Sequence, residues 1–427
     1  MTIQKKEVER CLEESQNHLE KELLPFWLEQ AQDREYGGLL THFDKDGRLE
    51  TEKIEKTLIA QTRTIYSMSS AHRAGYGAGR CAEVAKFGVK FLVEKMYDCE
   101  EGGFFWIVDR AGKVTSDKKI VYGMSFAIYA LAEFTLATGD PRGLELAEET
   151  FDLLMKHAVD TARGGYFEMF GRDWTPAGAG SAGGDRKTLD VHMHLMEAFT
   201  TLFEASGKGV HRRRLLEDIE ILTGRMLDHR YGTGIPQFTT DWTAVEPIKF
   251  DVVWGWDRFP EGGKKAKPKD NTAYGHNVEF AWLLLHALDV LGMGPEEHGE
   301  LVRKALTHAV ENGVDWEQGG VYVEGPASGG VYDTEKEFWQ QAEVLIGFLD
   351  GVLRFDAEKF WPAYVNVHRF VMDKMVQHKV GEWWPLMTRE GKPIWTHMGH
   401  SWKINYHTVR SMVQSIERLK KVLVRAR

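Results

Sequence analysis

Residues 102–114 read GGFFWIVDRAGKV, and similar stretches occur at five other places in the chain. They begin at Tyr36 (YGGLLTHFDKDGR), Gly164 (GGYFEMFGRDWTP), Tyr231 (YGTGIPQFTTDWT), Gly319 (GGVYVEGPASGG) and Gly381 (GEWWPLMTREGKP). Their first glycines, at positions 37, 102, 164, 232, 319 and 381, are separated by 65, 62, 68, 87 and 62 residues. Regular self-similarity indicates a repeat architecture, so we interpret the chain as six units of one kind, the fourth carrying an insertion.

Each glycine-rich stretch lies between two segments with apolar residues at helical spacing, and the second segment is the more apolar. The stretch itself alternates briefly, as in FFWIV, which predicts a short hairpin. Six such helical pairs close most economically into an all-α (α/α)6 barrel, with the apolar helices inside and short β-hairpins at one rim. An open solenoid is the alternative, but its units are usually shorter, about 34–47 residues. In a closed barrel, an active site belongs at the rim that carries the hairpins.

We expect a single barrel domain over residues 1–427, with a loop insertion at about residues 242–271. The insertion mixes Trp254, Trp256 and Arg258 with a stretch rich in Gly, Lys and Pro. Long loops are often functional, so it is either a surface loop or a lid over the rim, and the sequence leaves both interpretations open.

The composition argues against several classes of partner. Lys and Arg number 54 against 64 Asp and Glu, a net charge of −10, and the chain has no basic face interleaved with aromatic residues. Nucleic acid and anionic membranes are therefore poor partners. The N-terminal residues lack the apolar core of a secretory signal, and the three cysteines are too few for a disulfide framework. We expect a cytoplasmic protein, either a monomer or a homodimer.

Polar residues occur near the start of the apolar helical segments, where a core pattern should exclude them. In the third unit Asp190, His194 and Glu197 follow helical spacing on one face, whereas His192 points about the opposite way. Any single member has a structural explanation, but their coincidence across six units predicts a shared functional pocket. The set comprises Lys56, Arg63, Tyr122, Asp190, His194, Glu197, His276, Glu279, Trp339, Glu343, Trp402, Tyr406, His407 and Arg410.

The sequence predicts no cofactor and no metal. The stretch GAGSAG at residues 178–183 lacks the strand–helix context of a dinucleotide site, and no phosphate-binding loop motif is present. His192 and His194 are two residues apart on a helix and cannot chelate one ion. His397, His400 and His407 lack the usual zinc spacings.

At these residues the chain resembles the N-acylglucosamine 2-epimerase superfamily, and within it most closely the cellobiose 2-epimerases. The resemblance runs from about Tyr36 to Arg410 and rests on GGFFWIVDRAGKV, VHMHLMEAFT, YGHNVEFAWLL, FWQQAEVLIGF and WKINYHTVR together. It implies an (α/α)6 barrel without metal. It also implies that Arg63, His194, His276 and His407 match the family's arginine and three functional histidines, and that Tyr122, Glu279, Trp339, Glu343 and Trp402 match its sugar-binding positions.

Departures from the disaccharide epimerases bear on the substrate. Those enzymes carry Asn where this chain has Asp190, Asp at Asn277, and Trp and Pro at Phe338 and Gln340. A second wall of Trp suits a disaccharide. Its loss, together with the longer insertion, favours a monosaccharide such as mannose or glucose.

The expected reaction is epimerisation at C2 of a free reducing sugar. Two bases with pKa values near neutrality, on opposite faces of C2, perform it best. We assign His407 as the base that opens the ring and removes the C2 proton, and His276 as the acid opposite it. Arg63 and His194 would stabilise the enediolate oxygens. Glu279 would orient His276, while Glu343 would bond sugar hydroxyls or His407.

Three alternatives remain open. Return of the proton to C1 would make the same groups an aldose–ketose isomerase. A glycoside hydrolase would use two carboxylates from among Asp190, Glu279 and Glu343, although three convergent histidines argue against it. A noncatalytic sugar-binding protein would need no basic pair.

Overall fold

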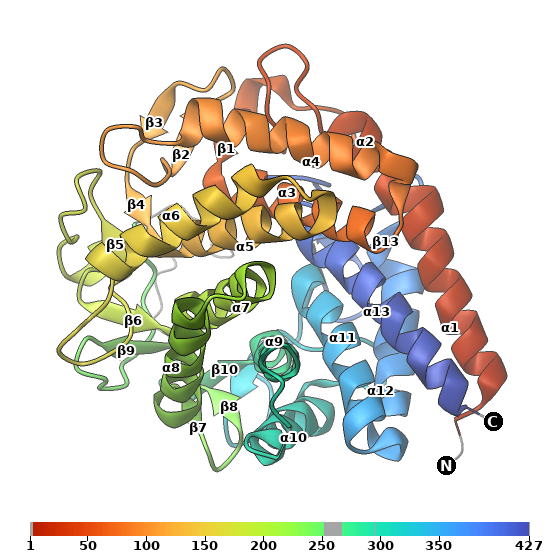
Figure 1. Ribbon diagram of the computed structural model, residues 1–427. Helices are drawn as coiled ribbons and strands as arrows, with labels where there is room; N and C mark the ends of the chain where they lie inside the picture. The colour runs from red at the N-terminus through yellow and green to blue at the C-terminus, as the bar shows by residue number, and fades with distance from the viewer. Residues whose placement is uncertain (1–2, 252–266, 295, 427) are drawn as a thin grey trace.

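The computed structural model describes residues 3–251, 267–294 and 296–426, which fold as an (α/α)6 barrel (Figure 1). The inner ring of the described residues consists of α3 (Leu58–Arg73), α5 (Val121–Thr138), α7 (Leu189–Ser206), α9 (Tyr274–Leu291), α11 (Phe338–Arg354) and α13 (Tyr406–Arg425). The outer ring consists of α1 (Lys5–His18) continued by α2 (Leu24–Gln30), α4 (Arg80–Phe91), α6 (Pro141–His157), α8 (Gly209–Arg225), α10 (Gly299–His308) and α12 (Ala357–Phe370). The predicted fold class is confirmed.

The inner ring closes on itself. Each inner helix contacts the next, from α3 through α5, α7, α9 and α11 to α13, and α13 contacts α3. The outer helix of each unit packs on the inner helix of the unit before it, and α1 packs on α13, which closes the outer ring in the same sense. Because an inner helix has neighbours on all sides, it is apolar all round, as the sequence of α5 shows.

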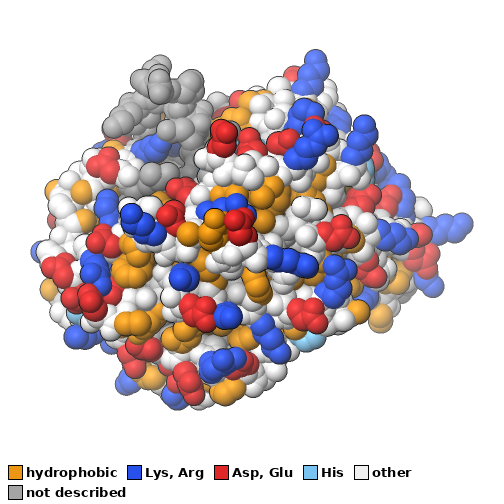
Figure 2. All heavy atoms as spheres, turned by 90° about the horizontal axis from the view of Figure 1, so that it is seen from above, with side chains coloured by type: hydrophobic (Ala, Val, Ile, Leu, Met, Phe, Trp, Pro, Cys, Tyr) orange, Lys and Arg blue, Asp and Glu red, His pale blue; other side chains and the backbone are white. Residues whose placement is uncertain are grey.

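Helix α5 is long and apolar enough to cross a membrane by length and composition alone. Its window is 78% buried inside the barrel, which is the environment of a core helix. On the face of the molecule shown in Figure 2, acidic and basic side chains are interspersed.

Short strands connect neighbouring units at one rim of the barrel. The strand before an inner helix pairs antiparallel with a strand that follows the next unit's glycine turn: β1 with β2, β4 with β5, β6 with β9, β10 with β11, and β12 with β15. A bridge between Phe43 and Gly399 joins the last unit to the first. The strands are β1 (Glu55–Thr57), β2 (Ile107–Asp109), β3 (Val114–Ser116), β4 (Lys119–Ile120), β5 (Met169–Phe170), β6 (Arg186–Thr188), β7 (Leu227–Asp228), β8 (Thr233–Gly234), β9 (Gln237–Thr239), β10 (Asn271–Ala273), β11 (Glu324–Pro326), β12 (Lys336–Glu337), β13 (Val376–Gln377), β14 (Glu382–Trp383), β15 (Leu386–Met387) and β16 (Pro393–Trp395).

The prediction of one hairpin within each unit was therefore incomplete. Local hairpins exist, such as β2 with β3 and β7 with β8. Alternation identifies a strand but not its partner, and here the pairing partner of the strand before most inner helices comes from the next unit.

A buried ion pair recurs behind these strands. The aspartate that opens a glycine turn binds the lysine of the strand before the same unit's inner helix: Asp33 with Lys56, Asp98 with Lys119, Asp160 with Lys187, and Asp315 with Lys336, at 2.8–3.1 Å between Nζ and Oδ2. In three units an arginine of the following unit, Arg110, Arg172 or Arg389, binds the same carboxylate. Each pair therefore anchors a turn to a strand, and each arginine ties one unit to the next.

The turns need glycine for conformation and for space. The Asp33 carboxylate accepts the backbone N–H groups of Glu35 and Tyr36, which forms the turn. Gly37 and Gly38 follow with φ of 81° and 72°, in the left-handed region that favours glycine. A Cβ atom at Gly38 would lie 2.6 Å from the Phe91 ring, so a side chain has no room there.

The start of the predicted insertion packs on the barrel. Trp242 has a φ of 70° and its indole N–H donates to the carbonyl of Arg163 at 2.9 Å. Asp251 bonds Ser181 within the glycine-rich loop GAGSAG. The interpretation of Trp254, Trp256 and Arg258 as a lid falls outside the described residues.

Asp315→Asn should destabilise the protein by about 3 kcal/mol, because it leaves the buried Lys336 without its charged partner while keeping an oxygen for the turn N–H groups. The matched control is Asp228→Asn, at the same place in the fourth unit. Asp228 pairs with Arg230, which is 77% exposed, so we expect a loss of about 1 kcal/mol or less.

Urea unfolding followed by circular dichroism measures both values. We expect a single transition, because the six units share one closed ring. Equal losses in the two variants, or separate transitions for different units, would contradict this account of the ring.

Candidate active site

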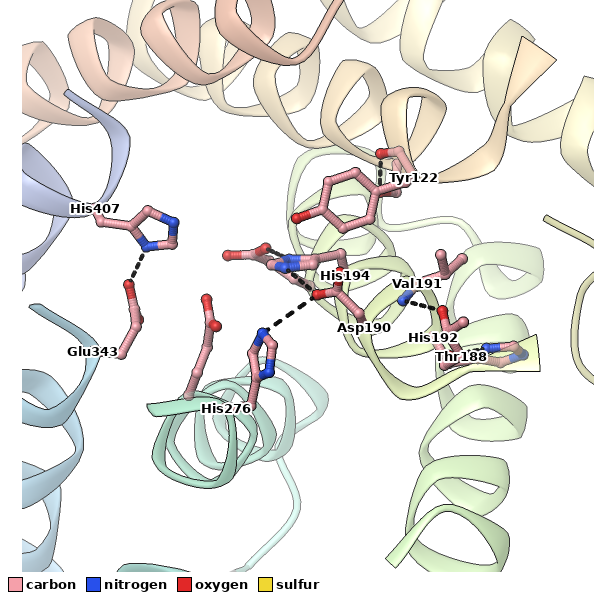
Figure 3. Close-up of polar contacts among 12 residues, drawn as sticks. Tyr122, Thr188, Asp190, Val191, His192, His194, His276, Glu343 and His407 are labelled. Carbon is pink, nitrogen blue, oxygen red and sulfur yellow. Dashed lines mark hydrogen bonds and ion pairs between the residues drawn. The ribbon is translucent and has the colours of Figure 1, made fainter. Parts of the chain in front are cut away.

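The site lies where the inner helices begin. Because a strand or loop at the same rim leads into every inner helix, their N-termini converge there. Several predicted residues occupy the second or third position of a helix: Tyr122 in α5, Asp190 in α7, His276 in α9, Trp339 in α11 and His407 in α13. The side chains of Tyr122, Asp190, His276 and His407 point toward a common centre (Figure 3). Helix N-termini carry partial positive charge, so this centre favours negative charge on a bound molecule.

His407 is held by Glu343. Its Nδ1 lies 2.6 Å from Glu343 Oε1 and donates to it, which leaves Nε2 as the acceptor on the other side of the ring (Figure 3). Burial lowers the pKa of His407 to about 3, although the bond to Glu343 opposes this shift. Burial alone would raise the pKa of Glu343, but Arg410 and His407 lower it. At neutral pH, His407 is therefore a neutral imidazole that can accept a proton, but its pKa lies well below the near-neutral value expected of the two bases from the sequence, because the site buries it.

Asp190 lies between the other two histidines. Its Oδ1 is 3.4 Å from His194 Nε2 and 3.6 Å from His276 Nε2, and the side chains of Asp190 and His276 are 37% and 32% exposed. The Nδ1 atom of His194 donates to Glu197 Oε2 at 2.8 Å. Burial would lower the pKa of His194, but the bonds to Asp190 and Glu197 outweigh it and raise the pKa to about 9.

His276 differs from His194 in charge at neutral pH. Burial lowers its pKa, and the more distant Asp190 only partly opposes the shift. The site therefore holds two neutral histidines, His276 and His407, and one imidazolium, His194.

Arg63 forms the opposite wall together with aromatic rings. Its NH2 group donates to the Tyr122 hydroxyl at 2.8 Å, and its guanidinium lies 4.4 Å from the Phe126 ring centroid. Tyr122 and Trp402 stack with ring centroids 5.5 Å apart and planes 12° apart. The positive charge of Arg63 is thus fixed among aromatic rings, where it can bind a developing oxyanion or a sugar hydroxyl.

Trp339 lies between the two neutral histidines, with its ring 4.5 Å from that of His276 and 5.8 Å from that of His407. Its position suits it to stack on a sugar. The neighbouring Phe338 is buried and packs edge-on against His407 at 5.9 Å. Phe338 therefore packs behind His407 and does not line the outer part of the pocket. The replacement of Trp by Phe338 consequently does not favour a monosaccharide over a disaccharide.

The predicted role of Glu279 was wrong in one respect. Glu279 does not orient His276: its Oε1 accepts from Arg410 NH2 at 2.7 Å, and the carboxylate that faces His276 is Asp190. His276 and Glu279 are three residues apart on α9, which places them on one helix face but does not make them partners. The fixed charge of Arg410, reaching across from α13, attracts Glu279 more strongly.

Glu279, Glu343 and His407 bring atoms that could bind a cation within 4.8 Å of one another. The guanidinium of Arg410 lies against both carboxylates, with NH2 at 2.7 Å from each, and supplies positive charge there. We therefore assign these residues to the arginine and not to a metal.

The ten residues predicted for the site all lie in one connected cluster. Two other residues of the sequence analysis do not. Lys56 lies in β1 and binds Asp33. His192 lies on α7, where its ring is buried and hydrogen-bonds the backbone carbonyl of Thr188 and the backbone N–H of Tyr166. The sequence analysis noted three residues near the helix starts but gave them no role: Glu197, Tyr406 and Arg410. In the structure they bind one another directly beneath the histidines. Trp282, which donates to Glu343, was missed because a tryptophan in an apolar helix reads as core.

Comparison with known proteins identifies the family and agrees with the fold. The family model of the N-acylglucosamine 2-epimerases (GlcNAc 2-epimerase) matches residues 37–411. A cellobiose 2-epimerase of Bacteroides fragilis is 27% identical, with 94% of this chain and 97% of that protein covered, and a D-mannose isomerase of Marinomonas mediterranea is 24% identical, with 94% and 96% covered. The solved structure of a cellobiose 2-epimerase from Bacillus thermoamylovorans B4167 superposes with a TM-score of 0.84 at 25% identity, covering 95% of this chain and 99% of that one.

The family model spans most of the chain, and the two relatives named above are a carbohydrate epimerase and a carbohydrate isomerase. The chain therefore belongs to the N-acylglucosamine 2-epimerase family.

Proposed function

We propose that the protein is a carbohydrate 2-epimerase, an isomerase that interconverts the C2 epimers of a free reducing sugar of glucose or mannose configuration. The observation that carries the proposal is the pair of neutral histidines, His276 and His407, flanking Trp339 in a site that also holds two cations, Arg63 and His194. A reaction that removes a proton and returns one needs one group that acts as the base while neutral and a second group that acts as the acid after taking a proton from solvent, and both histidines can take either form.

In this scheme the sugar ring opens first, and His407 Nε2 then takes the proton from C2. The C2–H electrons form the C1–C2 double bond, and the C1 oxygen becomes an oxyanion. Arg63 and the imidazolium of His194 stabilise this enediolate. Its negative charge develops in the transition state and is absent from the bound sugar, so this stabilisation lowers the barrier. His276 takes up a proton from solvent, because its lowered pKa leaves it neutral at neutral pH, and returns that proton to the other face of C2. The C1 carbonyl forms again, and His407 gives up the former C2 proton to solvent. The reverse reaction exchanges the two roles.

The names of the relatives support the reaction class. The cellobiose 2-epimerase relatives perform the same change at the reducing end of a disaccharide, while the D-mannose isomerase relative favours the alternative in which the proton returns to C1 and gives a ketose. Both outcomes use the same enediolate. A hydrolase would instead need a carboxylic acid free to protonate a leaving group. Burial and the neighbouring Glu343 raise the pKa of Glu279 to about 8, but Glu279 and Glu343 are both hydrogen-bonded by Arg410.

The first prediction concerns product and label. Incubated in heavy water with mannose, glucose, fructose and cellobiose in turn, the protein should convert at least one aldose to its C2 epimer and place solvent deuterium at C2. Sugar chromatography and proton NMR measure both. Deuterium at C1 of a ketose would identify the isomerase, cellobiose cleaved to glucose a hydrolase, and unchanged sugars a binding protein.

The second prediction concerns the two neutral histidines. His407→Asn and His276→Asn should each lower net epimerisation at least about 1,000-fold, because each histidine serves as acid or base in one half of the reaction. The remaining histidine can still exchange the C2 proton of one epimer. We expect residual deuterium exchange into a single epimer, and a different epimer in each variant. Full activity of either variant would contradict the assignment.

The third prediction uses the raised pKa of His194. A histidine with a folded pKa of about 9 and an unfolded pKa of about 6.5 adds stability that is fully present below pH 6.5 and is lost as the pH rises through 9. The stability difference between the wild type and His194→Gln should therefore be larger at pH 6 than at pH 9.5, by about 2–3 kcal/mol.

His192→Gln, on the same helix, is the matched control. Burial lowers the pKa of His192 to about 4, so its ring opposes folding as the pH falls below 6.5. The difference between the wild type and this variant should move in the opposite direction with pH. Urea unfolding at several pH values measures both, and parallel curves for the two variants would contradict the charge assigned to His194.

A further inference from the structure

Arg410 lies one turn below His407 on α13 and is completely buried. Its NH1 group donates to Glu197 Oε1 and to the Tyr406 hydroxyl, and its NH2 group donates to Glu279 Oε1 and Glu343 Oε1 at 2.7 Å each. One guanidinium thus binds three carboxylates that come from three different inner helices, α7, α9 and α11.

Two of these carboxylates hold the histidines. Glu343 Oε1 accepts from both Arg410 NH2 and His407 Nδ1, so the guanidinium and the imidazole share one oxygen atom. Glu197 uses one oxygen for Arg410 and the other for His194 Nδ1. A continuous chain of bonds therefore runs from His194 through Glu197, Arg410 and Glu343 to His407.

The guanidinium is also fixed in orientation. It lies 4.2 Å from the Tyr406 ring centroid and 4.9 Å from that of Trp282, and the Trp282 indole donates to the second oxygen of Glu343 at 2.9 Å. A guanidinium is planar, donates hydrogen bonds in two directions and stacks on aromatic rings, whereas the ammonium of a lysine cannot do all three.

We propose that Arg410 is the positioning residue of this site, which fixes Glu197 and Glu343 and through them holds the rings of His194 and His407 in place. The inference rests on the proposed function for its catalytic meaning. Arg410 itself does not reach the bound sugar, because its side chain is 0% exposed beneath the histidines.

The charges around His407 give the sign of the effect. His407 lies near Glu343 of α11 and Glu279 of α9, with ligand atoms of the three within 4.8 Å of one another. The positive charges near it are Arg63 of α3 and Arg410 of its own helix, and Glu197 of α7 binds Arg410. Removing the Arg410 charge leaves an excess of buried carboxylate, so uptake of a proton by the Glu343–His407 pair becomes more favourable. Whichever of the two takes that proton, His407 loses its function as a base at a higher pH than in the wild type.

The variants are Arg410→Met, which removes the charge, and Arg410→Lys, which keeps it but cannot bind in two directions. The matched control is Arg418→Met, two turns further along α13. Arg418 is also largely buried and binds Asp350 through two bonds of 2.9 and 3.0 Å. Its guanidinium lies 6.0 Å from the Trp282 ring centroid, and among the described residues it forms no ion pair with Glu197, Glu279 or Glu343.

The titration of His407 is measured by NMR of protein carrying 15N-labelled histidine, with the signal assigned by its absence in His407→Gln. In Arg410→Met the apparent pKa of His407 should rise by at least about one unit over the wild type. Arg410→Lys and Arg418→Met should stay within about half a unit. An unshifted His407 in Arg410→Met, or an equal shift in Arg418→Met, would overturn the proposal.

Kinetics give a second, independent readout. Arg410→Lys should lower kcat at least about tenfold and leave KM within about threefold, because it loosens the histidines without touching the sugar. If Arg410→Met does not fold, this variant carries the test, and wild-type kcat in it would overturn the proposal. If the wild-type protein converts no sugar, the proposed function fails, while the titration of His407 still decides the role of Arg410.

Discussion

The closed ring depends on buried charge pairs at the joints between units. In such a pair, the aspartate of one glycine turn binds a lysine of its own unit and an arginine of the next unit. The aspartate and the lysine are both buried, so either charge would be costly without its partner. Each such site fixes the turn, the strand and the neighbouring unit at once. The fourth unit lacks the buried lysine, since Thr272 stands two residues before α9, where the units of α3, α5, α7 and α11 have lysine, and this is also the unit that carries the insertion.

The ring in turn creates the active site. Because every inner helix begins at the same rim, residues near the helix starts meet although they are far apart in sequence. Burial and hydrogen-bond partners then decide the charge of each histidine. His194 is bracketed by two carboxylates and is positive, whereas His276 and His407 are neutral, so one residue type supplies both the electrostatic stabiliser and the two bases.

Much of this could be predicted from the sequence. The spacing of the glycine turns gave the number of units and the barrel, and polar residues at the starts of apolar helices identified the site, because both signals are local. Partners across the ring could not be predicted. The link between Asp33 and Lys56, the pairing of β1 with β2, and the capture of Glu279 by Arg410 depend on which segments meet in space. The sequence analysis paired Glu279 with His276 because it used only the spacing along one helix, which does not show that Arg410 reaches Glu279 from another helix.

The central claim is that His407 and His276 flank C2 of the sugar. A crystal structure of the protein with an open-chain alditol, such as sorbitol, tests it most directly, because the alditol copies the opened sugar but cannot lose its C2 proton. The account predicts C2 within about 3.5 Å of an imidazole nitrogen of each histidine, on opposite faces, with the C1 oxygen near Arg63 or His194. An alditol with both histidines on one face of C2, or bound away from Trp339, would contradict it.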